Sequence, residues 1–144
     1  VYKRQVKGHI YTGEPLAFLL DESQIQETIE PYFMARIVDV AQFLRLYPFE
    51  GSIRPFHFVV TDPMAEWNNG IFSVATDREG TVSVTDEPAG KAVELDIQTL
   101  SAMLMGYKRP SYLARIERLH TDKRTLRLLE EIIPDGQPYF SDYF

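Results

Sequence analysis

Apolar and polar residues alternate along four segments in the middle of the chain, and this period of two predicts β-strands. The stretches between them are short and rich in Asp, Pro and Gly, which favour turns and antiparallel neighbours. We predict a further, buried strand at residues 32–38, where an apolar run precedes the alternating segments. The alternating apolar positions are Phe56, Phe58 and Val60; Phe72 and Val74; Val82 and Val84; and Val93, Leu95 and Ile97.

Apolar residues at helical spacing predict helices before and after these strands. Start signals are the caps Asp39, Asp96 and Asp122 and the helix-opening Pro110, and stop signals are Pro48, Gly106 and Pro134. The predicted inward positions are Val40, Phe43, Leu44 and Tyr47; Ile97, Leu100, Met103 and Leu104; Leu113 and Ile116; and Leu126, Leu129 and Ile133. One face of the predicted sheet is apolar, so one layer of helices suits it. We predict an α+β domain with about five strands in a largely antiparallel sheet covered by helices on one face.

The first thirty residues differ from the rest of the chain. Residues 1–5 begin with Val1 and not with Met, and we expect them to be a non-native leader. Residues 6–10 and 15–20 are short strand candidates, and the polar residues 21–24 mark a domain boundary. The predicted organisation is therefore a leader at 1–5, an appended segment at 6–30 and a principal domain at 31–144.

Composition narrows the class of protein. The chain has 144 residues, 44% of them hydrophobic, which is enough for one compact core. It has no cysteine and a net charge of -6, so a thiolate site is excluded and a nucleic-acid surface is disfavoured. It shows neither a signal peptide nor an apolar run long enough to cross a membrane. We expect a soluble, cytoplasmic protein that binds no nucleic acid and no membrane.

At almost every position, a side chain that could act in catalysis or in ligand binding has a structural interpretation instead. The histidines are scattered, so we expect no metal site, and the glycines stand alone, so there is no phosphate-binding loop. The two candidate serine nucleophiles lack the motif or the neighbouring histidine that activates them. We interpret the paired basic residues as solvated helix ends and most aspartates as caps or turns. These positions are His9, His57 and His120; Ser111 and Ser141; Lys108, Arg109, Lys123 and Arg124; and Asp39, Asp62, Asp77, Asp86, Asp96 and Asp122.

Two features stand out from this background. The segment 62–70 places Trp67 beside Asn69-Gly70, which predicts a turn with positive φ, and Trp67 anchors the loop if it is buried. In that case replacing Trp67 with Ala costs roughly 3 to 5 kcal/mol. The second feature is the aromatic tail at 138–144, which we expect to pack against protein and so to hold its terminal carboxylate in place.

Several motifs resemble the C-terminal domain of the Eis-like N-acetyltransferases, which belong to the GNAT class. They are the sequence Arg-Ile-Val-Asp-Val at 36–40, Val-Thr-Asp-Pro at 60–63 leading to Trp-Asn-Asn-Gly at 67–70, Leu-Ser-Ala-Met-Leu-Met-Gly-Tyr at 100–107, and the tail ending at Phe144. The resemblance covers residue 31 to the end, and residues 6–29 look like the closing strands of the preceding GNAT domain. It implies a sterol-carrier-protein-like fold for 31–144.

The resemblance also implies an activity and a site. The family acetylates amines, aminoglycosides in some members, with acetyl-CoA held by a preceding domain that this chain lacks, so the chain alone is expected to be inactive. The α-carboxylate of Phe144 is implied to be the general base, with Asp142 and Tyr143 near the acceptor pocket. The implied partners are an amine substrate, the preceding GNAT domains and further copies in a bacterial hexamer.

Two other functions remain open at this stage. A lipid-binding or small-ligand module would show an enclosed apolar cavity of several hundred cubic ångströms under the helices. An oligomer-organising domain would show an exposed apolar patch on the polar face of the sheet.

Overall fold

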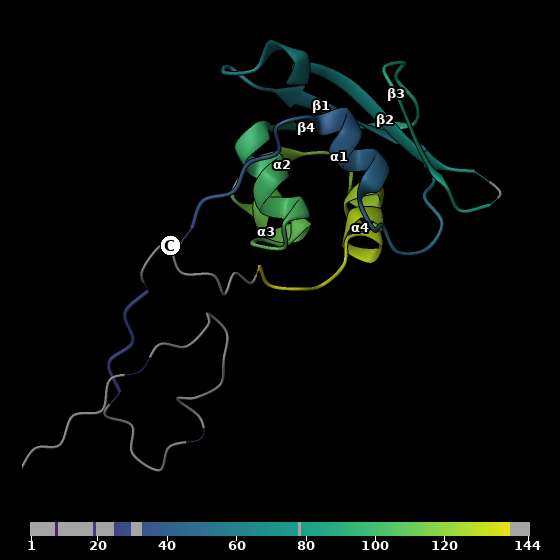
Figure 1. Cartoon of the computed structure of the whole chain (residues 1–144). Coiled ribbons are helices and arrows are strands. Elements are labelled where there is room, and N and C mark those ends of the chain that lie inside the picture. The colour runs from purple at the N-terminus through teal and green to yellow at the C-terminus, as the bar shows by residue number, and fades with distance from the viewer. Residues whose placement is uncertain (1–7, 9–18, 20–24, 30–32, 78, 139–144) are drawn as a thin grey trace, which may run out of the picture. The chain divides into compact units, whose positions relative to one another are not determined.

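The structure is a computed structural model that describes residues 8, 19, 25–29, 33–77 and 79–138 (Figure 1). The chain divides into two units, Val1–Met34 and Ala35–Phe144. In the first unit residues 25–29 form neither helix nor strand. The predicted leader at 1–5 lies outside the described residues, and so do most residues of the strands predicted at 6–10 and 15–20.

Five strands form one sheet in the order β3-β2-β1-β4-β5. They are β1 (Phe56–Thr61), β2 (Gly70–Thr76), β3 (Val82–Thr85), β4 (Lys91–Asp96) and β5 (Leu119–His120). The pairs β1–β2, β2–β3 and β4–β5 are antiparallel, whereas β1 and β4 are parallel. The prediction of a largely antiparallel sheet is confirmed. The parallel pair arises because the chain crosses from one edge strand to the far side of β1 after the β1–β2–β3 meander.

The strand predicted within 32–38 is wrong, because residues 33–38 form no strand. Of these residues Ile37 alone is buried, and its amide donates to the Ser101 side chain at 3.1 Å instead of to a neighbouring strand. Met34 and Val38 are 97% and 67% exposed. The fifth strand is β5, which pairs with β4 and was not predicted, because two residues are too few to show an alternating pattern.

Four α-helices were predicted in the right places. They are α1 (Val40–Leu46), α2 (Ile97–Leu104), α3 (Pro110–Arg115) and α4 (Lys123–Ile132). The three predicted caps are confirmed, because each carboxylate accepts from first-turn amides: Asp39 from Gln42, Asp96 from Thr99, and Asp122 from Arg124 and Thr125. Ile116 was predicted to point inward but is 46% exposed, because α3 ends one residue before it.

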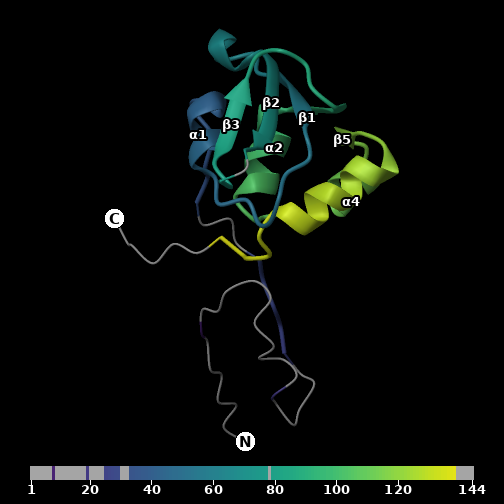
Figure 2. The same ribbon diagram turned by 90° about the vertical axis from the view of Figure 1, so that its right-hand side faces the viewer.

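The helices cover one face of the sheet, as predicted, and Figures 1 and 2 show this two-layer arrangement. Phe56, Phe58 and Val60 of β1 point into the layer between them, and His57 lies on the opposite, more polar face, as expected. The rings of Phe56 and Phe58 meet edge to face at 5.1 Å. Other fully buried members of this core are Leu44, Val74, Val93, Ile97, Leu100, Met103, Leu119, Leu129 and Ile133.

Candidate functional site

The predicted site residues Phe144, Asp142 and Tyr143 lie outside the described residues. The structure does describe residues 133–138, the segment through which α4 leads to them. In Figure 1 this yellow segment leaves the lower end of α4 and runs beneath α3. Contacts from the connection between α2 and α3 hold this segment in place.

Arg109, immediately before α3, binds the end of α4. Its Nη1 donates to the carbonyls of Ile133 and Pro134 at 3.0 and 3.1 Å, and its Nη2 donates to the carbonyl of Glu130 at 2.7 Å. Its Nε donates to Glu130 Oε2 at 2.9 Å. The side chain is 30% exposed, so the expectation of a solvated helix end is wrong for Arg109. The last carbonyls of a helix have no hydrogen-bond donors within the helix, and the Arg109 guanidinium supplies these donors.

Glu130 completes this Arg109 cluster. Its second carboxylate oxygen accepts from the amide of Ser111 at 2.6 Å, so one glutamate joins the first turn of α3 to the last turn of α4. Burial raises the pKa of Glu130, but hydrogen bonds from Ser111 and Arg109 and the charge of Arg109 lower it by more. The net pKa lies below the usual range, so the carboxylate stays ionised opposite Arg109. The amide of Ser111 thus has a helix-start role, as expected.

Gly106 lies against the same segment. It has φ +76°, a conformation that favours glycine, and so it ends α2 as predicted. A methyl group placed here would overlap the carbonyl oxygen of Gly136. The chain after α4 therefore passes directly over the turn that ends α2, and only a residue without a side chain leaves room for it.

Tyr47 follows α1, and its ring packs against two other aromatic rings, one tilted and one edge to face. Its ring centroid lies 5.8 Å from that of Phe43 and 4.6 Å from that of Phe49. Burial raises the pKa of the Tyr47 phenol to about 12, although the charge of Arg109 opposes this rise. The phenol therefore stays protonated at neutral pH, and Tyr47 is part of the packing on this side of the domain.

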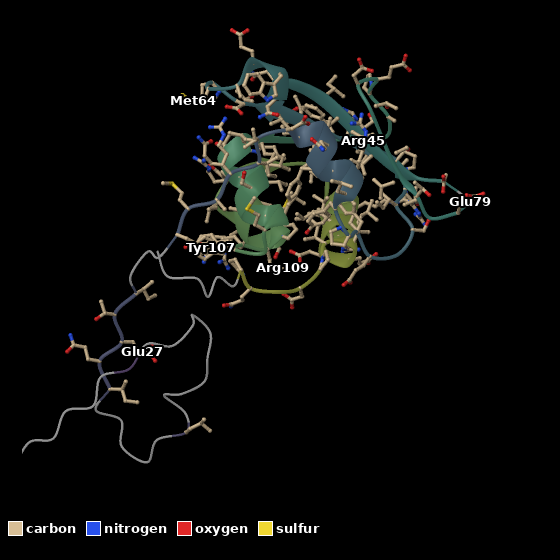
Figure 3. All side chains as sticks on the ribbon, in the orientation of Figure 1. Glu27, Arg45, Met64, Glu79, Tyr107 and Arg109 are labelled. Atoms are coloured by element: carbon tan, nitrogen blue, oxygen red, sulfur yellow. The ribbon has the colours of Figure 1, made fainter. Side chains whose placement is uncertain are left out.

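A second polar cluster lies at the other end of the domain, around the segment 62–70. Figure 3 shows Met64 of this segment well apart from Arg109. The Asp62 side chain is fully buried, and both of its oxygens accept from Arg36 Nη2, at 2.7 and 2.5 Å. It also accepts from the amides of Met64 and Ala65 and from Asn68 Nδ2 at 2.9 Å. Asp62 was expected to be an ordinary turn residue, but it is the centre of this buried group, the Asp62 cluster.

Burial raises the pKa of Asp62, but hydrogen bonds from Asn68, Met64 and Arg36 lower it by more, so that it falls from 3.8 to about 2. Asn68, also fully buried, accepts from the amide of Val40 and donates to the carbonyl of Val38. The cluster thereby joins the β1–β2 connection to the segment that enters α1. Gly70 has the predicted positive φ, but Asn69 has φ -80°.

Trp67 does not anchor this loop through burial. It is 67% exposed, and its Nε1 donates to the carbonyl of Val38 at 2.8 Å. The indole ring therefore remains largely on the surface. A destabilisation of several kcal/mol on replacing Trp67 with Ala was conditional on burial of this ring, and the ring is not buried.

An open hollow of about 310 Å³ lies on the face of the sheet away from the helices. Its lining includes Glu94, Asp96, Arg118 and His120, and Arg118 forms an ion pair with Asp96 at 2.7 Å. The lipid-binding hypothesis predicted instead an enclosed apolar cavity under the helices, where buried core side chains are packed. Among the described strand residues none is a large exposed hydrophobic side chain, the signature expected of an oligomer-organising sheet face.

No helix in the described part of the chain is long and apolar enough to cross a membrane. Within residues 8, 19, 25–29, 33–77 and 79–138, no group of His, Asp or Glu side chains could hold a metal ion.

A family match covers most of the second unit. The sterol carrier protein domain matches residues 40–141, which include Asp62 and Asn68, the Arg109 cluster and the whole sheet. The chain belongs to the sterol carrier protein domain family. The sterol-carrier-protein-like fold that the sequence motifs implied is therefore confirmed. A search of curated proteins finds no match.

Solved structures extend this finding. A conserved protein of unknown function and probable N-acyltransferase from Enterococcus faecalis V583 is 32% identical, with a TM-score of 0.81 over 93% of this chain and 34% of its own. A GCN5-related N-acetyltransferase from Anabaena variabilis ATCC 29413 is 24% identical, with a TM-score of 0.71 over 88% of this chain and 32% of its own. Eis1 from Mycobacterium abscessus is 23% identical, with a TM-score of 0.63 over 76% of this chain and 27% of its own.

This chain thus spans about a third of the length of these proteins. The last two likenesses establish a shared fold.

The Asp62 and Arg109 clusters could not have been found from the sequence by spacing alone. Arg36 lies 26 residues from Asp62, and Arg109 lies 21 residues from Glu130. The one local signal was the unusual density of Asp, Trp, Asn and Gly in 62–70.

Proposed function

We propose that this sterol carrier protein domain is part of an acetyl-CoA-dependent N-acetyltransferase that acts on an amine. One observation carries the proposal: the 32% identity and TM-score of 0.81 over 93% of this chain to a probable N-acyltransferase. The sequence motifs that resemble Eis-like acetyltransferases support it independently. The same resemblance suggests aminoglycosides as one class of acceptor and a hexameric assembly.

In this proposal the domain supplies a proton acceptor to an active site formed with preceding GNAT domains, which bind acetyl-CoA. The amine nitrogen attacks the thioester carbonyl, a C–N bond forms and the C–S bond breaks. The α-carboxylate of Phe144 accepts the proton that the amine loses, and a tyrosine of a preceding domain protonates the departing thiolate. Positioned acid and base groups of this kind contribute roughly 10² to 10⁴ in rate. Asp142 and Tyr143 line the acceptor pocket.

The test compares acetyl transfer to a panel of amines, including an aminoglycoside, by the complete polypeptide containing this chain with and without Phe144. Removal of Phe144 is expected to lower kcat by roughly a hundredfold or more, because the carboxylate moves back by one residue. An added glycine after Phe144 moves the carboxylate the other way and is expected to act similarly. Phe144→Ala keeps a terminal carboxylate at the same chain position and should retain more activity than either.

Two results would contradict the proposal at different levels. Full activity after removal of Phe144 would exclude the terminal carboxylate as the base while leaving the acetyltransferase class intact. Absence of acetyl transfer to every amine, with acetyl-CoA bound, would exclude the reaction class. Circular dichroism and thermal unfolding of each variant serve as the control that the fold is unchanged.

A further inference from the structure

We propose that Arg109 and Gly106 are positioning residues that set the path of the C-terminal segment, and so deliver the terminal carboxylate to the active site. This inference rests on the proposed function. It concerns residues remote from the carboxylate that touch neither substrate nor acetyl-CoA in the proposed mechanism. It is carried by contacts to residues 130–136, all of which the structure describes.

The first step is the way in which Arg109 holds the end of α4. Its guanidinium donates to the carbonyls of Glu130, Ile133 and Pro134, with donor–acceptor distances of 2.7 to 3.1 Å. The planar, fork-like guanidinium presents its donors in fixed directions, so these three carbonyls are fixed relative to one another. One of them belongs to the last turn of α4, and the other two belong to the chain beyond it. Arg109 therefore ends the helix and directs the residues that follow.

The Arg109 side chain is itself held in place by Glu130. Glu130 Oε2 accepts from its Nε, and Glu130 Oε1 accepts from the amide of Ser111. Glu130 thus holds the guanidinium, and the first turn of α3 in turn holds the Glu130 carboxylate. Asp135 also approaches Arg109, at 4.0 Å, but Asp135 is 94% exposed, so this pair adds little.

The third step is the passage over Gly106. The carbonyl of Gly136 occupies the space that a side chain at 106 would need. This contact lies two residues beyond Pro134, the last residue whose carbonyl accepts from Arg109. Two successive fixed points, at Pro134 and at Gly136, define a direction for the chain and not merely a position.

The fourth step is the distance that remains. Six residues follow Pro138, and six extended residues span at most about 21 Å. The Phe144 carboxylate therefore lies within this span of Pro138, and the effective concentration of a group falls as the chain between it and its last fixed contact lengthens. Loss of the contacts at Pro134 and Gly136 moves the last fixed contact among residues 133–138 back toward α4, and so lowers the effective concentration of the base at the active site.

The test uses Arg109→Lys and Gly106→Ala in the complete polypeptide, each with and without Phe144. Lysine keeps the charge but cannot donate to three carbonyls and a carboxylate at once. With Phe144 present, each variant is expected to lower kcat roughly ten- to a hundredfold, because misplacement by about 1 Å has effects of this size. The KM for acetyl-CoA should be unchanged. Without Phe144, neither substitution should lower kcat further.

Arg127→Lys is the matched control, since Arg127 is an exposed arginine on α4 and the substitution is the same. Backbone ¹⁵N order parameters of Asp135, Gly136 and Gln137 in the 144-residue chain give an independent measure of how firmly the path is held. They are expected to be lower in Arg109→Lys and unchanged in Arg127→Lys. Arg109→Lys serves alone if Gly106→Ala does not fold.

The outcomes separate the two proposals. If removal of Phe144 abolishes activity while Arg109→Lys retains the full kcat, the positioning role is wrong and the proposed function stands. An equal loss from Arg109→Lys with and without Phe144 would mean that Arg109 only stabilises the fold, which also overturns the inference. If removal of Phe144 has no effect, the base assignment is wrong, and the positioning role fails together with it.

Discussion

The Asp62 and Arg109 clusters are both arginine–carboxylate pairs, but they are organised in opposite ways. In the first, a fully buried carboxylate lies at the centre and accepts from Arg36, Asn68 and two backbone amides. In the second, a partly exposed guanidinium lies at the centre and donates to three backbone carbonyls and Glu130. One centre gathers backbone donors, and the other gathers backbone acceptors.

The difference follows from the backbone that each cluster serves. The turn after β1 presents unpaired amides, which a carboxylate can satisfy, whereas the end of α4 presents unpaired carbonyls, which need a donor. The Asp62 cluster is enclosed, so its loss leaves buried groups without partners. The Arg109 cluster is nearer to solvent, where water replaces lost bonds, so its loss should redirect the chain more than it destabilises the domain.

Acid should produce the largest effect, because it acts on the carboxylates of both clusters. The pKa of Asp62 is lowered from 3.8 to about 2, and the pKa of Glu130 is lowered from 4.5. The unfolded chain therefore binds protons first as pH falls, and the stability present above these unfolded values is lost on the way down to about pH 2. Urea midpoints measured across this range should fall. Asp62→Asn should show a smaller fall, and an equal fall would place the acid sensitivity elsewhere.

Asn68→Ala tests the enclosed cluster alone. The substitution leaves the buried amide of Val40 without its acceptor and Asp62 without one donor, so it should destabilise the domain by about 3 kcal/mol. Asn69→Ala is the matched control, because Asn69 is exposed and its side chain bonds only to the backbone of Asp62 among the described contacts. It should cost about 1 kcal/mol. Urea denaturation measures both, and equal costs would contradict the role given to burial.

Arg109→Ala should cost less than Asn68→Ala, about 1.5 kcal/mol, because the guanidinium is 30% exposed and water can enter the space that it leaves. The same variant should lower the backbone ¹⁵N order parameters of residues 135–137, where Asn68→Ala leaves them unchanged under native conditions. Thermal unfolding and ¹⁵N relaxation together measure this contrast. A destabilisation as large as that of Asn68→Ala would remove the distinction between the two clusters.

Trp67→Ala should have the smallest effect, about 0.5 kcal/mol. The side chain is 67% exposed, and the carbonyl of Val38 that it binds also accepts from Asn68. Chemical denaturation would reveal the difference from the 3 to 5 kcal/mol that burial of this tryptophan would imply. A cost in that range would show that the tryptophan packs against protein in solution.

The sequence predicted the layers of this domain well because their signals are local. The alternation in β1 and the carboxylate caps at Asp39, Asp96 and Asp122 depend on residues within a few positions of one another. The prediction failed at residues 33–38, where an apolar run has no strand to pair with, and at β5, which consists of two residues. The predicted tail residues Asp142, Tyr143 and Phe144 remain predictions.

The sequence by itself determined the α+β class, the helix starts and ends, the apolar face of the sheet and the likeness to Eis-like proteins, because backbone preference and side-chain period act over short spans. The tertiary structure alone decided that the Asp62 carboxylate is buried and paired with Arg36, that Arg109 ends α4, and that the chain at Gly136 packs against Gly106. Each of these contacts joins residues more than twenty positions apart. Their energies depend on burial and on the direction of hydrogen bonds, which exist only once the chain has folded.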